Sequence, residues 1–231
     1  AEGRTKNARK IAIIFAVLLA LFVLWRVITG WAPSRTDYPV QGVAVDESQG
    51  KPFWPTLAAT GVEFAYLTAT VGDKKRDSEF ATNLAATRDA GIRVGAIHRF
   101  DICRLATDQA TLFITTVPRH ENALPPVVEL GFSKTCSGRP DRALILSELS
   151  TFLSQVEAHS GSPAVFMVSQ DFEEQYKVTG SIDRNVWLER TWLLPDYAAK
   201  PWVMWTANPR RRVSGLEGAV RAGVAGGAGV I

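Results

Sequence analysis

The sequence has few cysteines and histidines, the residues on which disulfide-rich and metal-binding proteins depend. It contains two cysteines and three histidines among 231 residues, too few cysteines for a disulfide-rich scaffold, and the histidines show no metal-ligand spacing. The hydrophobic share of 46% excludes an intrinsically disordered chain, and there is no collagen-like repeat. We therefore expect a folded domain with a sizeable core, and we expect no metal ion and no cofactor.

An excess of positive charge is absent beyond the first ten residues. The formal net charge is +3, and residues 1–10 alone carry four basic side chains against one acidic side chain. That short stretch accounts for the whole net charge, so the remainder of the chain is neutral overall. A neutral body lacks the basic surface that nucleic-acid binding requires, and we expect no nucleic-acid partner.

One long apolar segment follows the basic stretch. Residues 11–31 carry a single charge, Arg26, and about 20 apolar residues can cross a bilayer as a helix. Trp25 and Trp31 suit a membrane interface, and the basic tail at 1–10 predicts a cytoplasmic N-terminus with the remainder on the periplasmic or extracellular side. A cleaved signal peptide is the alternative, although the segment has no convincing small-residue cleavage site after it.

The rest of the sequence alternates between apolar runs and amphipathic runs. A polar linker at 32–40 precedes a single domain at 41–231. We expect strands at 42–45, 62–70, 92–100, 126–132, 164–169, 186–190 and 201–207, and helices at 54–60, 78–90, 107–117 and 142–159. Such alternation is typical of a mainly parallel sheet, and a parallel α/β barrel would place its chemistry at the carboxyl ends of its strands.

Two features of this domain have open interpretations. Cys103 and Cys136 would meet an oxidising compartment in the expected topology, so they either form a disulfide or remain two separate buried thiols. The basic residues 210–212 and Arg221 either bind an acidic partner or lie on a solvated turn and a surface strand.

Several motifs of the domain follow one another in a recognisable order. They are 42–50 (GVAVDESQG), Trp54, 61–72 (GVEFAYLTATVG), 91–98 (GIRVGAIH), 125–130 (PPVVEL), 202–205 (WVMW) and 215–218 (GLEG). This series resembles glycoside hydrolase family 25, the Chalaropsis-type lysozymes, which cleave peptidoglycan next to N-acetylmuramic acid. The resemblance covers nearly all of the domain and implies an irregular TIM-like barrel of eight strands.

The same resemblance implies an acidic cluster that this sequence has largely lost. Family members carry an Asp in the first strand, an Asp-x-Glu pair ending the fourth and an Asp near the last strand. The matching positions here are Ala44, Glu129, Gly131 and Arg221. Glycoside hydrolysis needs one protonated carboxyl and a second carboxylate. The family's general acid would stand at Gly131, so we expect hydrolysis to be impaired.

Other carboxylates could replace the missing ones. Asp46 lies two residues after Ala44, on the same face of an extended strand, and could form a catalytic pair with Glu129. The competing interpretation is that Asp46 is a solvated loop residue and that Glu129 pairs with Arg99 or His98.

Four residues near strand ends are candidates for substrate binding. They are His98, Asp101, Trp205 and Thr68. Three of them have a structural alternative: His98 as a hydrogen-bonded core histidine, Asp101 as a carboxylate that caps the next segment, and Trp205 as a core tryptophan. Thr68 stands where the resemblance implies a lysine.

Two functions therefore remain. The first is a membrane-anchored, hydrolytically impaired lysozyme-like protein that binds peptidoglycan glycan strands or serves as an accessory subunit of a membrane protein complex. The second is an active N-acetylmuramidase that uses Glu129 and Asp46.

Overall fold

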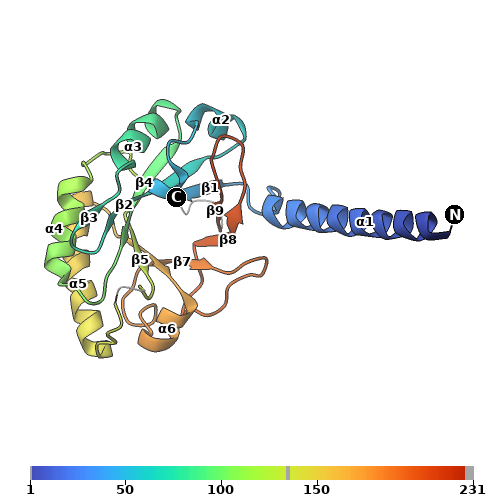
Figure 1. Ribbon diagram of the computed structural model, residues 1–231. Helices are drawn as coiled ribbons and strands as arrows, with labels where there is room; N and C mark the ends of the chain where they lie inside the picture. The colour runs from blue at the N-terminus through green and yellow to red at the C-terminus, as the bar shows by residue number, and fades with distance from the viewer. Residues whose placement is uncertain (1, 134–135, 227–231) are drawn as a thin grey trace.

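The computed structural model describes residues 2–133 and 136–226, with only the backbone for residues 2–6 and 8. One long helix leads into a closed barrel wrapped by shorter helices (Figure 1). The helices are α1 (Glu2–Gly30), α2 (Trp54–Ala59), α3 (Phe80–Asp89), α4 (Ala106–Thr116), α5 (Arg142–Ser160) and α6 (Gln170–Tyr176), with a short 3-10 turn, η1, at Glu47–Gln49.

The strands form one sheet that closes on itself. They are β1 (Gln41–Val45), β2 (Phe64–Val71), β3 (Lys75–Arg76), β4 (Arg93–Arg99), β5 (Val127–Leu130), β6 (Val165–Val168), β7 (Asn185–Glu189), β8 (Met204–Arg211) and β9 (Val220–Ala225). The order is β1-β9-β8-β7-β6-β5-β4-β2-β3, and β1 also pairs with β2. Eight strands therefore close the barrel, while β3 pairs at its rim with β2 alone.

The direction of the strands is mixed. Each pairing from β1 through β2 and β4 to β8 is parallel, whereas β9 runs antiparallel to both β8 and β1. The expected mainly parallel α/β barrel is confirmed. All seven expected strands are present. The two-residue strand β3 and the strand β9 were not expected. Half of β9 is glycine or alanine, and its sequence does not alternate between apolar and polar residues.

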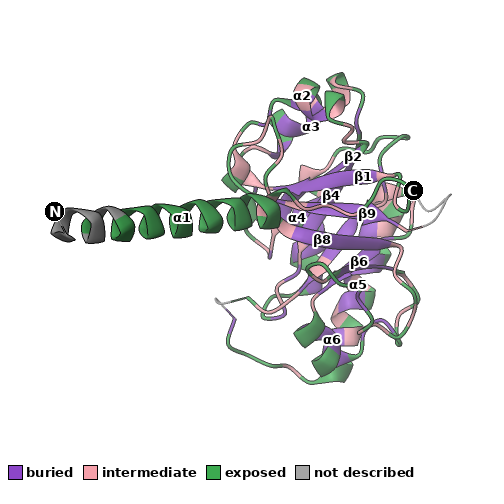
Figure 2. Ribbon diagram, turned by 90° about the vertical axis from the view of Figure 1, so that its right-hand side faces the viewer, coloured by how far each residue is buried: buried purple, intermediate pink, exposed green. Residues whose placement is uncertain are grey.

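Side-chain alternation divides the core into two layers. Residues of one strand face pack inside the barrel, among them Phe64, Tyr66, Ile97 and Trp187. The other face packs beneath the surrounding helices and forms the larger cluster, which includes Leu67, Val128 and Phe152. Buried strands are thus enclosed on both sides (Figure 2), the usual consequence of parallel strands joined by crossover helices.

The end of α1 packs directly on the barrel wall. The side-chain amide of Asn208 in β8 donates to the carbonyls of Ile28 and Trp31 at 3.1 and 3.0 Å. The segment after α1 is also fixed, since Gln41 donates to the carbonyl of Pro33 at 2.9 Å. Residues 9–30 of α1 are long and apolar enough to cross a membrane by length and composition, and their apolar side chains are exposed (Figure 2).

Candidate functional site

The carboxyl ends of the parallel strands surround two adjoining cavities at one end of the barrel. One cavity has a volume of about 380 Å³ and is lined by Ala44, Asp46, Gln49, Arg99, Glu129, Glu189, Pro209, Ala219 and Arg221. The other, of about 530 Å³, shares Arg99 and Glu129 and extends past Gly131 toward Asp101 and Arg104. This is the end of a parallel barrel where chemistry is expected.

A chain of alternating charges crosses the floor of these cavities. Asp46 follows β1 and accepts a hydrogen bond from Arg99 Nη2 at 2.7 Å. The same guanidinium donates from Nε to Glu129 Oε2 at 2.9 Å. Arg221 Nη1 donates to Glu129 Oε1 at 2.8 Å, and its Nη2 lies 3.3 Å from Oε2. Glu129 is therefore gripped by two guanidinium groups.

The strand register explains why Arg221 points into the site. Arg221 in β9 is the partner of Ala44 in β1, and partners in an antiparallel pair project to the same face. The side chain of Ala44 belongs to the interior cluster, so the Arg221 side chain also enters the barrel, where it is 17% exposed. The interpretation of Arg221 as a solvated surface residue is wrong.

Both carboxylates of the expected catalytic pair are held in the ionised form. Burial by itself would raise the pKa of Glu129, but the charges and hydrogen bonds of Arg221 and Arg99 outweigh it and lower that pKa. Burial likewise opposes ionisation of Asp46, and hydrogen bonds from Ser48 together with Arg99 lower the pKa below its usual value. A general acid requires the opposite shift.

Glu189 is a cavity residue that sequence reasoning missed. It ends β7 and lines the same cavity as Glu129 and Arg221. Desolvation raises its pKa, the charge of Arg221 opposes that rise, and the charge of Glu129 adds to it. The signal was available, because residues 186–190 were expected as a strand and a carboxylate at a strand's carboxyl end belongs to the mouth.

Gly131 leaves room where the family's general acid would stand. A Cβ built there would meet Ser169 Oγ at 3.4 Å, an ordinary van der Waals contact. The backbone would therefore accept a side chain at this position, so the missing acid does not follow from a steric requirement for glycine.

His98 lies outside the mouth, on the buried face of β4 that packs under α4 and α5. It is fully buried and its ring stacks on Phe152 at 4.6 Å. Nδ1 lies 2.7 Å from the Thr70 hydroxyl, and Nε2 lies 3.1 Å from Gln109 Oε1. Burial lowers the pKa of His98 to about 4, partly offset by Gln109. The expected pairing of His98 with Glu129 is wrong, because alternation places His98 and Arg99 on opposite faces.

Trp205 and Thr68 are also buried in this structure. Trp205 lies on the outer wall, where Nε1 donates to the carbonyl of Arg190 at 2.8 Å and the ring packs against Trp31. Thr68 is 1% exposed, and its hydroxyl has no hydrogen-bond partner among the described residues. His98, Trp205 and Thr68 are all buried and line neither cavity, so their expected role in substrate binding does not fit this structure.

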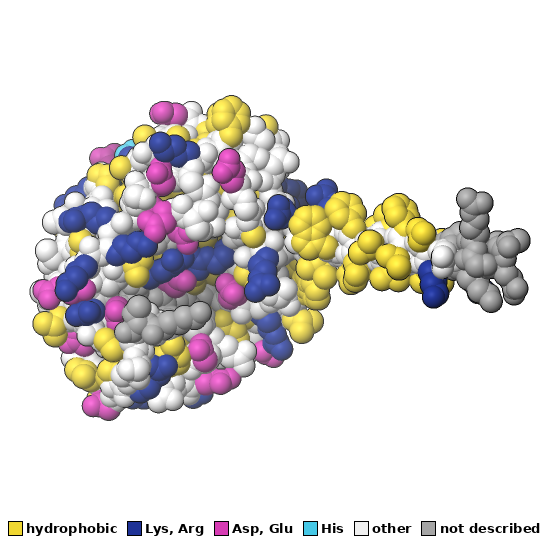
Figure 3. All heavy atoms as spheres, in the orientation of Figure 1, with side chains coloured by type: hydrophobic (Ala, Val, Ile, Leu, Met, Phe, Trp, Pro, Cys, Tyr) yellow, Lys and Arg dark blue, Asp and Glu magenta, His cyan; other side chains and the backbone are white. Residues whose placement is uncertain are grey.

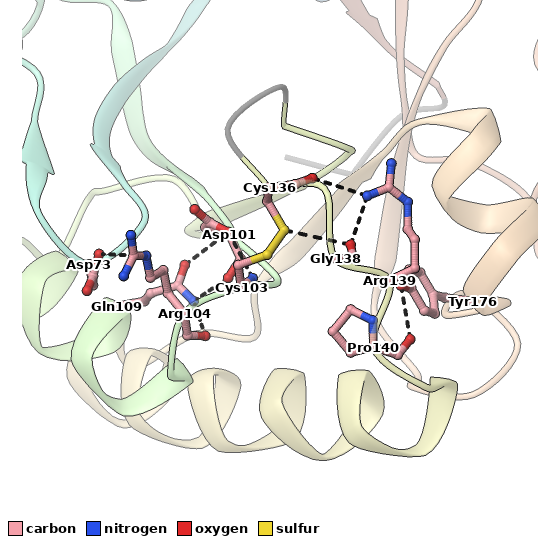
Figure 4. The surroundings of a disulfide bond; sticks show 10 residues. All are labelled: Asp73, Asp101, Cys103, Arg104, Gln109, Cys136, Gly138, Arg139, Pro140 and Tyr176. Atoms are coloured by element: carbon pink, nitrogen blue, oxygen red, sulfur yellow. Dashed lines mark hydrogen bonds and ion pairs between the residues drawn. A yellow bond between two sulfur atoms is a disulfide. The ribbon is translucent and has the colours of Figure 1, made fainter.

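Asp101 remains at the edge of the mouth and is fixed by the disulfide loop (Figure 4). Its Oδ1 accepts a hydrogen bond from the Cys103 N–H at 2.9 Å. Cys103 is bonded to Cys136, with 5.9 Å between their Cα atoms. The disulfide, one of two open interpretations, is therefore formed, and it uses both sulfur atoms that could have ligated a metal beside Asp101.

Two proteins are similar to this chain in sequence, one of them uncharacterized and the other a lysozyme. The uncharacterized protein YegX of Escherichia coli (strain K12) is 26% identical over 195 residues, which is 80% of this chain and 68% of YegX. Lysozyme M1 of Streptomyces globisporus is 26% identical over 157 residues, which is 66% of this chain and 47% of that lysozyme.

Solved structures and a family model agree with the resemblance. The family 25 glycosyl hydrolase from Bacillus anthracis superposes with a TM-score of 0.79 at 26% identity, over 87% of this chain and 94% of that chain. A bacterial lysozyme from Streptomyces coelicolor, at 22% identity over 82% of this chain and 93% of its own, has the same fold with a TM-score of 0.73. The model of glycosyl hydrolases family 25 matches residues 43–215, and the chain therefore belongs to that family.

Proposed function

We propose that this protein is a membrane-anchored, lysozyme-like binder of peptidoglycan glycan strands that does not hydrolyse them efficiently. The observation that carries the proposal is the grip of Arg221 and Arg99 on Glu129 at the position of the family's acidic cluster. Membership of the family supports a peptidoglycan ligand, and the altered cluster supports binding without cleavage.

The charges in the mouth oppose the usual reaction. Cleavage of a glycosidic bond passes through a transition state with positive charge on the sugar ring, which family enzymes stabilise with carboxylates. Here two guanidinium groups stand among the cavity's acids, and Glu129 and Asp46 are both ion-paired to Arg99. Loss of a general acid alone costs ~10²–10⁴ in rate. In addition, the two arginines neutralise the carboxylates that would otherwise stabilise the positive charge of the transition state.

The same charges suit a bound ligand. The guanidiniums and carboxylates of the cavities offer hydrogen-bond donors and acceptors at fixed positions, as recognition of a sugar with polar and acidic substituents requires. Two cavities that share Arg99 and Glu129 provide one continuous surface along which a polymer can lie.

The α1 helix supplies the proposed anchor. Its apolar side chains from Ile11 to Ile28 are exposed rather than packed on the barrel, which suits a helix in lipid. With the basic tail in the cytoplasm, the barrel would face the peptidoglycan side of the membrane.

The test uses the full chain in a non-ionic detergent with insoluble peptidoglycan. We expect the protein to sediment with peptidoglycan and to release no reducing ends. Arg221→Gln should weaken sedimentation, whereas Arg119→Gln, a matched change remote from the cavities, should not.

Two results would contradict the proposal. Failure to sediment would refute glycan binding and would favour a role as an accessory subunit of a membrane complex. Release of reducing ends that Glu129→Gln abolishes would instead establish an active muramidase, and Glu189 would then be the next carboxyl to replace.

A further inference from the structure

The loop between β7 and β8 carries an exposed apolar tip that lines neither cavity of the mouth. The residues of this tip, Trp192, Leu193 and Leu194, are 48%, 59% and 55% exposed. Outside α1, the described residues include three other exposed large hydrophobic side chains, which are isolated in sequence: Phe53, Leu105 and Leu144. Single exposed apolar residues are ordinary, whereas a contiguous group marks an interaction surface.

The fold holds this tip in place. Trp192 has a φ of 64°, in the left-handed region that residues other than glycine rarely adopt. Its N–H donates to the carbonyl of Ala207 in β8 at 3.1 Å, and the Arg190 guanidinium donates to the carbonyl of Leu194 at 3.2 Å. Such a backbone conformation persists only where surrounding contacts enforce it, so the apolar side chains are presented on a rigid support.

The tip and the end of α1 lie on the same side of the barrel. Trp205 contacts both of them. Its Nε1 donates to the carbonyl of Arg190, at the start of the loop, and its ring centre lies 6.4 Å from that of Trp31, which directly follows α1. Asn208, three residues further along β8, binds the last turn of α1 at Ile28. Figure 1 shows the loop projecting from the barrel beside the point where α1 leaves it.

Basic side chains gather at the same junction. Arg26 in α1 and Arg210 and Arg212 at the end of β8 are exposed. The Arg212 N–H donates to the carbonyl of Thr29 at 3.0 Å, and its guanidinium lies 5.1 Å from the centre of the Trp25 ring. Figure 3 shows Lys and Arg side chains on the barrel surface around the base of α1.

We propose that this surface docks on the phospholipid bilayer that α1 enters. The tip of Trp192, Leu193 and Leu194 lies at the boundary of headgroups and acyl chains, and the arginines bind anionic lipid headgroups. Apolar side chains beside basic ones are the pattern that an anionic membrane surface attracts. The inference rests on the proposed anchoring of α1, because only an inserted α1 brings lipid to this side of the barrel.

The test places one fluorescent probe at a time on the full chain in vesicles. Cysteine variants carry nitrobenzoxadiazole at Leu193→Cys in the tip, at Leu18→Cys in α1, or at Leu144→Cys on α5. The native cysteines are bonded to each other and leave the introduced thiol to react. Leu144 is the matched control, because it is an exposed leucine of α5, a helix on the side of the barrel away from α1 (Figure 1).

The vesicles contain phosphatidylcholine and phosphatidylglycerol, with quenching nitroxides at a shallow or a deep acyl position. We expect shallow nitroxides to quench the Leu193→Cys probe, deep ones to quench the Leu18→Cys probe, and neither to quench Leu144→Cys. A quenched α1 probe with an unquenched tip probe would refute docking and leave the anchor standing. An unquenched α1 probe would refute the anchor and the docking together.

The arginines are tested with the same tip probe. The double variant Arg210→Gln/Arg212→Gln should reduce quenching of the Leu193→Cys probe in vesicles with phosphatidylglycerol and have little effect in vesicles of phosphatidylcholine alone. The control Arg119→Gln should change neither. Equal loss in both kinds of vesicle would overturn the role given to anionic headgroups, because phosphatidylcholine carries a phosphate but no net charge.

Discussion

Replacing His98 by glutamine should make the stability of the barrel less sensitive to mild acid. Gln109 fixes the proton arrangement: its Oε1 accepts from the Asp101 N–H, and its Nε2 donates to the carbonyls of Asp101 and Arg104. Oε1 is thus an acceptor for the N–H at His98 Nε2, and Nδ1 accepts from the Thr70 hydroxyl. The folded site therefore holds a neutral imidazole.

The size of the effect follows from the pKa. Burial lowers the pKa of His98 to about 4, whereas an exposed histidine titrates near 6.5. Because the folded pKa is depressed, this contribution to stability is present above about pH 6.5 and is lost as the pH falls toward 4. Linkage gives a loss of ~2 kcal/mol between about pH 7.5 and pH 5, and ~3 kcal/mol by about pH 4.

The assay is urea unfolding of the full chain in detergent, followed by tryptophan fluorescence, at both ends of the pH range. Between about pH 7.5 and pH 5, the free energy of unfolding should decrease by about 2 kcal/mol less in His98→Gln than in the parent. His120→Gln, at an exposed histidine, should behave like the parent. A His98→Gln variant with the full pH dependence of the parent would refute a neutral buried imidazole.

Three further predictions concern the mouth and the disulfide. Glu129→Gln should lower the urea midpoint. The free energy of unfolding should fall by less than the roughly 3–5 kcal/mol that breaking a fully buried pair costs, because this site is partly exposed, and Glu129→Gln/Arg221→Met should recover part of the loss. Equal midpoints for the parent and the single variant would contradict the ion-pair geometry. The triple variant Ala44→Asp/Gly131→Glu/Arg221→Asp should release reducing ends from peptidoglycan, with Gly131→Glu contributing ~10²–10⁴ in rate. A well-folded but silent triple variant would show that the missing acids alone do not explain the proposed loss of hydrolysis. Reduction of Cys103–Cys136, which are 33 residues apart, should cost about 4 kcal/mol by the loop-entropy relation, and an unchanged urea midpoint in reductant would contradict it.

The strands were predictable because their signals are local. Glycines such as Gly61 and Gly91 were expected to end helices just before β-branched strands, and both adopt positive φ where such an end requires it. The strand β9 was missed for the converse reason. Its residues, three of which are glycine or alanine, are placed by pairing with β1 and β8, a long-range contact that a local pattern does not record.

The sequence predicted which acidic residues of the site are missing, but not the contacts that Arg221 makes in their place. The replacement of acids at Ala44, Gly131 and Arg221 is visible in the sequence once the family motifs are aligned. The grip on Glu129 is not, because it depends on the register that brings β9 beside β1 and on the length of the arginine side chain. Arg99 was correctly expected as a partner of Glu129, since β4 and β5 are adjacent strands.

The contacts around the linker fix the position of the barrel relative to α1. Arg35 donates to the carbonyl of Gly61 at 2.7 Å, and the Tyr38 ring packs 5.9 Å from that of Trp205, so residues between α1 and β1 are part of the wall and not a free tether. A barrel joined in this way to an inserted α1 could not swing outward through the cell wall. It would travel with its helix in two dimensions, and its mouth would sample only those glycan strands that lie within one barrel width of the lipid.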